Sequence, residues 1–153
     1  MVKRYVFGCL FGLVLIFGIG VLAGSLGGMV DIPSLIIVLG LPFAAVFISH
    51  GPARTGKAIQ TAFEKEEIPT TISELRKAKA CIKALNGYLI VSTLMASIIG
   101  GIGILTNLKE LSHLGPNFAV LLVSNLYVTI FILLFTSPLI ARLEDRIIGT
   151  SAQ

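Results

Sequence analysis

Four long stretches of the sequence contain no Asp, Glu, Lys or Arg, and more polar segments separate them. They cover residues 5–23, 33–49, 88–105 and 118–141. A helix needs about 20 mostly apolar residues to cross a hydrocarbon core of roughly 30 Å, and each stretch has about that length. Apolar and polar residues do not alternate as in barrel strands, whereas a helix satisfies its own backbone groups. The pattern predicts an all-α integral membrane protein with four transmembrane helices.

The largest polar segment, residues 50–87, lies between the second and third spans. Within it, Thr71-Ile72-Ser73-Glu74 is typical of a capping box at a helix start. Apolar residues then recur at helical spacing, which predicts a helix that runs into the third span. A shorter helix is expected to continue from the second span. Spans two and three would therefore extend into a short cytoplasmic helical hairpin, and residues 1–153 would form a single four-span membrane domain.

The Lys and Arg residues are distributed unevenly between the two sides of these spans. Of the 12, only Lys109 lies between spans three and four, and the others precede span one, lie in segment 50–87 or follow span four. The positive-inside rule then places both termini and segment 50–87 in the cytoplasm. The net charge of +4 follows from this topology, so no nucleic-acid partner is expected.

Composition narrows the class of protein further. The chain is 55% hydrophobic and only 13% charged, whereas soluble domains carry about 25% charged residues, which excludes a soluble single-domain enzyme. Two cysteines do not suggest a disulfide framework. His50 and His113 have no further ligand at metal-binding spacing, so no metal site is expected. No phosphate loop or nucleophile triad is readable, and we expect no catalytic residues, no cofactor and no enzyme activity.

The spans contain no ionisable residue of the kind that marks proton relays, so the chain alone does not predict a conventional proton pump. Polar residues gather instead in spans three and four, where Thr93 and Ser97 stand four apart and so do Asn125 and Thr129, with Ser124 beside them. Two such faces turned to a common axis would line a narrow polar path. The alternative, more frequent for any one such residue, is hydrogen bonding between helices or to the residue's own backbone.

Prolines and small residues predict local features of the spans. Pro42 and Pro138 lie inside spans two and four, where each predicts a kink or a flex point, a structural kink being the more common outcome. Ala96 and Gly100 stand four apart in span three, and small residues at this spacing allow helices to approach closely. Such packing can occur within a subunit or between subunits.

The block DIPSLIIVLG at residues 31–40 and a second block at residues 98–143 resemble the MotA/TolQ/ExbB proton-channel family, most closely a MotA-type stator subunit. The first block, DIPSLIIVLG at residues 31–40, resembles the start of the second span of MotA-type proteins. The second block, residues 98–143, resembles their third span, outer loop and fourth span in order and spacing. Its matching motifs are Ile99-Gly100, Asn107-Leu108, Leu114-Gly115-Pro116, Ala119-Val120, Leu126-Tyr127 and Pro138-Leu139.

The resemblance implies a homopentamer in which spans three and four line a central pore. In the family, a dimer of single-span partners of the MotB, TolR or ExbD type occupies that pore and brings the Asp that binds the proton. The hydroxyl position of span three then falls on Ser97, that of span four on Asn125 next to Ser124, and the proline near the cytoplasmic end of span four on Pro138. The resemblance therefore implies the pore wall of an ion-driven, stator-like complex in a bacterial-type inner (plasma) membrane, with the proton as the expected ion.

The chain departs from the family pattern in three ways. Its cytoplasmic segment is much shorter than that of a flagellar stator, Ile90 stands near the position of an expected proline, and Asn125 replaces the usual Thr. These departures favour an alternative, a non-conducting oligomeric membrane scaffold whose central pore is filled by lipid. A small-solute channel without energy coupling is a third possibility.

Overall fold

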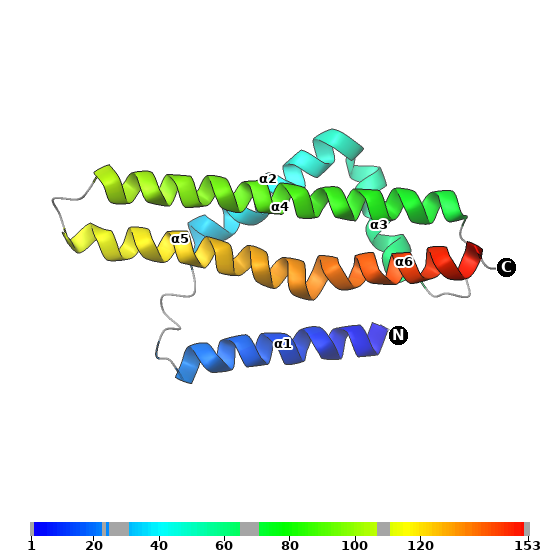
Figure 1. Cartoon of the computed structure of the whole chain (residues 1–153), viewed down its shortest axis with the longest axis horizontal. Helices are drawn as coiled ribbons and strands as arrows, with labels where there is room; N and C mark the ends of the chain where they lie inside the picture. The colour runs from blue at the N-terminus through cyan, green and yellow to red at the C-terminus, as the bar shows by residue number, and fades with distance from the viewer. Residues whose placement is uncertain (1, 23, 25–30, 65–70, 107–110, 152–153) are drawn as a thin grey trace.

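The computed structural model describes residues 2–22, 24, 31–64, 71–106 and 111–151, and every regular element in these ranges is helical (Figure 1). The elements are α1 (Val2–Leu22), α2 (Ile32–His50), α3 (Pro52–Phe63), α4 (Ile72–Thr106), α5 (Leu111–Phe131), the π-helical segment η2 (Ile132–Thr136) and α6 (Ser137–Ser151). Four stretches are long and apolar enough to cross a membrane: Tyr5–Leu22, Ile32–His50, Ile72–Thr106 and Leu114–Ser151. The predicted all-α class is confirmed, and so are four helices that are long and apolar enough to cross a membrane.

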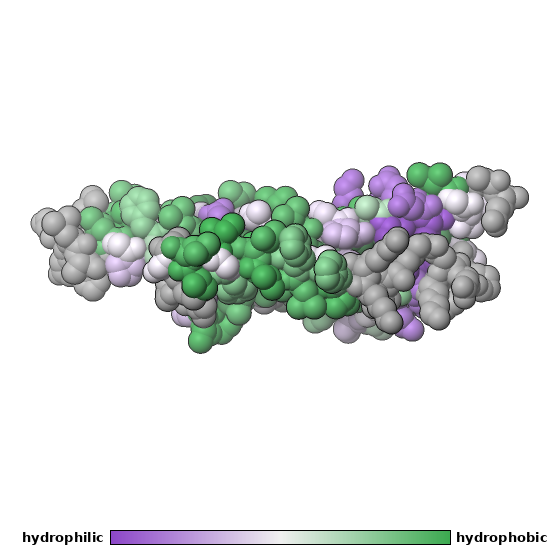
Figure 2. Space-filling model, turned by 90° about the horizontal axis from the view of Figure 1, so that it is seen from below, coloured by the Kyte–Doolittle hydropathy of each residue, from purple (hydrophilic) through white to green (hydrophobic). Residues whose placement is uncertain are grey.

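The helices are arranged along one long axis. Figure 1 shows α4 beside the continuous rod of α5, η2 and α6, with α2 behind α4 and α1 along the other side of the rod. The start of α1, the end of α6 and α3 lie at the same end of the molecule. Hydrophilic residues gather at that end, and hydrophobic residues cover most of the remaining length of the face seen in Figure 2. The side of the membrane to which this polar end belongs stays a prediction from the Lys and Arg distribution.

The start of α2 follows from its first residues. The Asp31 side chain accepts a hydrogen bond from the Ser34 backbone N–H at 3.1 Å, and Pro33 occupies the first turn, where a missing N–H costs little. The Asp31 backbone N–H donates to the Tyr127 hydroxyl of α5 at 2.8 Å. The helix ends at His50 because Gly51 has φ of +79°, so α3 begins as a new helix instead of continuing α2.

The third span is part of one helix of 35 residues, α4, which continues without a break past Asn86 and Gly87. One of the two hydrogen bonds of the predicted capping box is present at its start, where the Glu74 N–H donates to the Thr71 hydroxyl at 3.3 Å. The Glu74 carboxylate accepts a hydrogen bond from the same hydroxyl and pairs with Lys57 of α3 at 2.8 Å. Glu74, the last residue of the capping box, thus also links α4 to α3.

Arginines of α6 hold the far end of α3. The Arg146 guanidinium, only 8% exposed, donates to the Thr61 carbonyl at 2.9 Å, and Arg142 donates to the Glu64 carbonyl. The last carbonyls of a helix have no partner within that helix, and a basic side chain near them satisfies this need. α3 also packs against α4, and its Ala58 and Ala62 are buried. These bonds fix α3 across α4 and α6.

Pro42, inside α2, cannot donate to the Val38 carbonyl one turn earlier. In a bilayer no water replaces that bond, so a neighbouring side chain must supply it. The Ser92 hydroxyl of α4 lies 3.1 Å from the Ile37 carbonyl oxygen and 3.4 Å from that of Val38. Ser92 is 2% exposed, so this bond joins α2 to α4 inside the subunit.

Pro138 produces the corresponding situation in the fourth span. The helix widens into η2 just before it, where the Ser137 N–H bonds to the Ile132 carbonyl. The Leu134 carbonyl, which Pro138 leaves without an N–H partner, accepts from the Cys9 thiol of α1 at 3.2 Å. The Tyr5 hydroxyl donates to the next carbonyl, of Phe135, at 3.4 Å. The predicted local departure at Pro138 is a π-helical turn that also anchors α1.

The fourth span begins earlier than its proline. The apolar stretch predicts a fourth span from residue 118, but α5 already begins at Leu111, and Pro116 lies inside it. A proline this close to a helix start leaves only one carbonyl, that of residue 112, without its bond, near the end of the helix. Apolar content alone therefore predicts a start for this helix that lies too late in the sequence.

Replacing Ser92 with Ala should lower the free energy of unfolding by about 1 kcal/mol, because a carbonyl freed by Pro42 loses its donor. This loss of unfolding free energy should be smaller in a Pro42→Ala background, because residue 42 then has a backbone N–H that can donate to the Val38 carbonyl. Equilibrium unfolding in mixed detergent micelles measures both. Ser73→Ala, at an exposed position of the same helix, serves as the control. Equal costs in the two backgrounds would contradict the coupling.

The contact between α3 and α4 should respond to acid. The Lys57 ammonium, through its hydrogen bond and charge, lowers the pKa of Glu74 from its ordinary value of 4.5, with a smaller contribution from Thr71. A lowered carboxyl pKa contributes stability that is present above 4.5 and is lost as the pH falls through the folded-state value. Unfolding measured between neutral and acid pH should show this loss. Glu74→Gln should remove this loss, and Lys57→Gln should remove most of it, because the hydrogen bonds with Thr71 remain. The effect is small because both side chains are exposed.

Candidate functional site

Two of the polar residues predicted to line an ion path meet in the structure. Ser97 of α4 and Asn125 of α5 come from antiparallel helices, and the Asn125 Nδ2 donates to the Ser97 Oγ at 2.9 Å. Thr129, one turn further along α5, donates its hydroxyl to the Asn125 backbone carbonyl at 2.8 Å. The three residues form one polar group within the mainly apolar parts of α4 and α5.

This polar group lies on the outside of the folded chain. Asn125 and Thr129 are exposed, and Ser97 is half-buried. We call the surface around them the α4–α5 face; its other exposed residues are Ile90, Leu94, Ile98, Phe118, Leu122 and Leu133.

The second transmembrane helix covers the opposite side of α5. Tyr127 accepts the Asp31 N–H, and the Phe131 ring meets Phe43 of α2 edge-on at 6.2 Å between ring centroids. Because Tyr127 and Phe131 point toward α2, the α4–α5 face has no cover within the described part of the chain.

The hydrogen bonds of Ser97 and Asn125 leave one donor and one acceptor of this polar pair available. Asn125 Nδ2 also donates to the Leu121 carbonyl at 2.8 Å, so both amide hydrogens have acceptors. Among the described residues, neither the Asn125 Oδ1 nor the Ser97 hydroxyl hydrogen has a partner. The face therefore presents one strong acceptor and one donor to whatever lies against it.

The two remaining predicted residues point into the subunit. Ser124 is fully buried and donates to the Val120 carbonyl of its own helix at 2.7 Å. Thr93 is 8% exposed, and its hydroxyl has no hydrogen-bond partner among the described residues. Neither side chain lies on the α4–α5 face, although Thr93 is one turn before Ser97 in α4 and Ser124 directly precedes Asn125 in α5.

Close packing of small residues sets the position of the polar pair. A Cβ added to Gly100 would lie 3.2 Å from the Leu121 Cβ and 3.5 Å from the Asn117 carbonyl oxygen. A Cβ on Gly103 would lie 3.1 Å from the Asn117 Oδ1. Of the predicted small-residue pair, Gly100 thus contacts α5 within the chain and Ala96 is buried, and the close approach at Gly100 brings Ser97 within reach of Asn125.

The sequence reasoning missed the donors that serve the prolines, namely Ser92 for Pro42 and Cys9 for Pro138. A signal was present, because a proline inside a span requires a donor at the same membrane depth on another span. Ser92 lies one turn inside span three and Pro42 lies near the middle of span two, so depth alone does not select Ser92. Choosing between candidate donors still required the packing of the helices.

The described residues contain no group of three or more His, Cys, Asp or Glu side chains placed to hold a metal ion. No family model matches the chain, and a comparison with curated proteins finds no match. The interpretation of the site therefore rests on its geometry and chemistry.

Replacing Gly100 with Leu should force α4 and α5 apart and lower the free energy of unfolding by about 1 to 3 kcal/mol. The matched control is Gly101→Leu, since nothing lies within 4 Å of a Cβ at Gly101. That control should stay within about 0.5 kcal/mol of the unmodified protein. Chemical unfolding in micelles measures both, and equal losses would show that Gly100 does not set the helix separation.

Proposed function

We propose that the chain is a pore-wall subunit of an ion-driven, stator-like membrane complex, with the proton as the ion moved. Its α4–α5 face would turn toward a central axis in a ring of identical subunits, a pentamer on the family resemblance. A single-span partner of the MotB, TolR or ExbD type would occupy the axis and supply the carboxylate that the four spans lack. Membership of the MotA/TolQ/ExbB proton-channel family is part of this proposal.

The observation that carries the proposal is the exposed polar group at Ser97, Asn125 and Thr129 on a membrane-crossing helix pair. An unpaired amide oxygen placed in hydrocarbon costs roughly 2 to 7 kcal/mol, depending on the reference environment. A face that carries such a group is therefore better suited to protein or water than to lipid tails. The apolar residues around it suit close packing against another helix.

The free groups of the pair suggest how the face would act on a partner's carboxylate. The Ser97 hydroxyl hydrogen is available as a donor to a carboxylate, because Asn125 already supplies the hydrogen bond that the Ser97 oxygen accepts. The Asn125 Oδ1 would accept a hydrogen bond from a water that approaches along the path. One proton crossing a potential of 100 mV releases about 2.3 kcal/mol, enough to bias a rotation of helices about each other.

Further parts of the proposal concern topology and motion. The polar end would lie in the cytoplasm of a bacterial-type inner membrane, with both termini there, and α3 with the first part of α4 would form the short cytoplasmic hairpin. Pro138, beside η2, would be the point where the fourth span flexes, and Pro42 the corresponding point in α2. Ser124 and Thr93 would act from the subunit interior, behind the face.

Ion flux in the complete complex tests this function. The complex is purified from its native membrane through a tag on this chain and placed in vesicles under an imposed potential, and internal pH is followed. Ser97→Ala and Asn125→Ala should each reduce the proton flux at least tenfold, which corresponds to about 1.4 kcal/mol of lost stabilisation. Asn125→Thr should retain flux, and Ser73→Ala, at an exposed position on the polar half of α4, should not change it.

Two results would contradict the proposal. Unchanged flux in both alanine variants would remove the polar pair from the ion path. A cryo-EM map showing a ring whose central axis holds only lipid, together with an absence of flux, would favour the non-conducting scaffold. Two additional helices on the axis would support the stator-like arrangement.

A further inference from the structure

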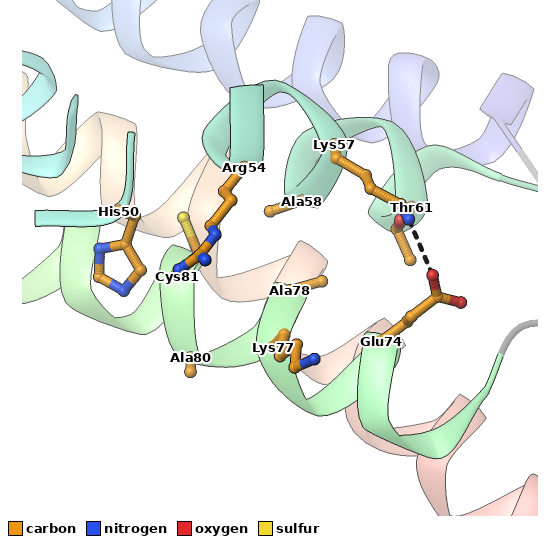
Figure 3. A pocket seen from close by; sticks show the side chains of 10 residues that line it. All are labelled: His50, Arg54, Lys57, Ala58, Thr61, Glu74, Lys77, Ala78, Ala80 and Cys81. Carbon is orange, nitrogen blue, oxygen red and sulfur yellow. Dashed lines mark hydrogen bonds and ion pairs between the residues drawn. The ribbon is translucent and has the colours of Figure 1, made fainter. Parts of the chain in front are cut away.

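A second candidate site lies at the polar end of the molecule, away from the α4–α5 face. A cavity of about 460 Å³ opens between α3 and the first part of α4 (Figure 3). Its volume is in the range of ordinary small-ligand pockets. The residues that line it are His50, Arg54, Lys57, Ala58, Thr61, Glu74, Lys77, Ala78, Ala80 and Cys81.

The lining is basic. Arg54 and Lys57 come from α3 and Lys77 comes from α4, against Glu74 as the single acid in the lining. Figure 3 shows Lys57 joined to Glu74 at one end of the cavity, at 2.8 Å, so these two charges neutralise each other. Within the described residues, Arg54 and Lys77 make no ion pair. Two positive charges therefore remain for a ligand.

The cavity begins where a membrane-crossing helix ends. His50, the last residue of α2, lies at the other end of the cavity, on the side of Arg54 in Figure 3. At the same level, the Tyr88 hydroxyl of α4 donates to the Ser49 hydroxyl at 3.1 Å, and tyrosine favours the boundary between hydrocarbon and water. This end of the cavity is thus at the depth of lipid headgroups.

From this combination we propose that the cavity between α3 and α4 binds the phosphate headgroup of an anionic phospholipid. Arg54 offers a planar fork of donors that matches two phosphate oxygens, and Lys77 offers a second charge from the facing helix. Thr61 adds a hydroxyl at the lining. Basic pockets between helices at the membrane surface recognise anionic headgroups in this manner. A bound lipid would tie α3 to α4 in addition to the ion pair of Lys57 with Glu74.

Native mass spectrometry of the full-length protein complex in detergent tests the proposal, with phosphatidylglycerol as the anionic probe and phosphatidylcholine as the zwitterionic one. The double variant Arg54→Gln/Lys77→Gln should weaken phosphatidylglycerol binding about tenfold or more. The control Arg76→Gln/Lys83→Gln removes the same charge from exposed positions outside the cavity and should change binding less than about twofold. Arg54→Lys, which keeps the charge, should lie between the unmodified protein and the double variant.

Three results would overturn the proposal. Equal losses in the two double variants would mean that binding follows total charge and not the cavity. Equal binding of phosphatidylcholine would remove the requirement for an anionic headgroup. Displacement of phosphatidylglycerol by inorganic phosphate at a concentration comparable to that of the lipid would assign the cavity to a soluble phosphate.

Discussion

The structure depends on hydrogen bonding where water is absent. Inside a bilayer, each backbone carbonyl needs a partner from the protein, and prolines inside two of the spans remove partners from the helix itself. Ser92 serves the carbonyls near Pro42, and Cys9 serves the carbonyl that Pro138 leaves free. Each of these bonds joins two different helices. The prolines thus do more than bend helices, because they determine which neighbours pack together.

The same requirement separates the polar side chains of the spans into two classes. Ser92 and Ser124 are buried and donate to backbone carbonyls, so they belong to the packing of the subunit. Ser97 and Asn125 bond to each other at the surface and still present an unused donor and acceptor. A group with unused hydrogen-bonding capacity at membrane depth indicates a further partner, whether another helix or water. This difference gives the α4–α5 face its functional interpretation.

The two ends of α4 carry different chemistry on one continuous helix. In the apolar half, Gly100 permits close approach to α5 and the exposed polar pair lies beside it. In the polar half, Glu74 and Lys77 face α3 across a basic cavity. Since α4 has no break between these halves, the cavity and the candidate ion path share one continuous helix. A lipid held at the cavity would therefore contact the helix that also forms the candidate ion path.

Hydropathy and capping are local properties, so the sequence predicts the all-α class, the four apolar spans, the helix start at Thr71 and a departure at Pro138. Which polar residues meet depends on the tertiary structure. Helical spacing places Thr93 near Ser97 along one helix, but the packing against α5 and α2 turns Thr93 inward and leaves Ser97 at the surface. The bond from Ser97 to Asn125 requires the register of two antiparallel helices, which close contacts at Gly100 set and which no local pattern encodes.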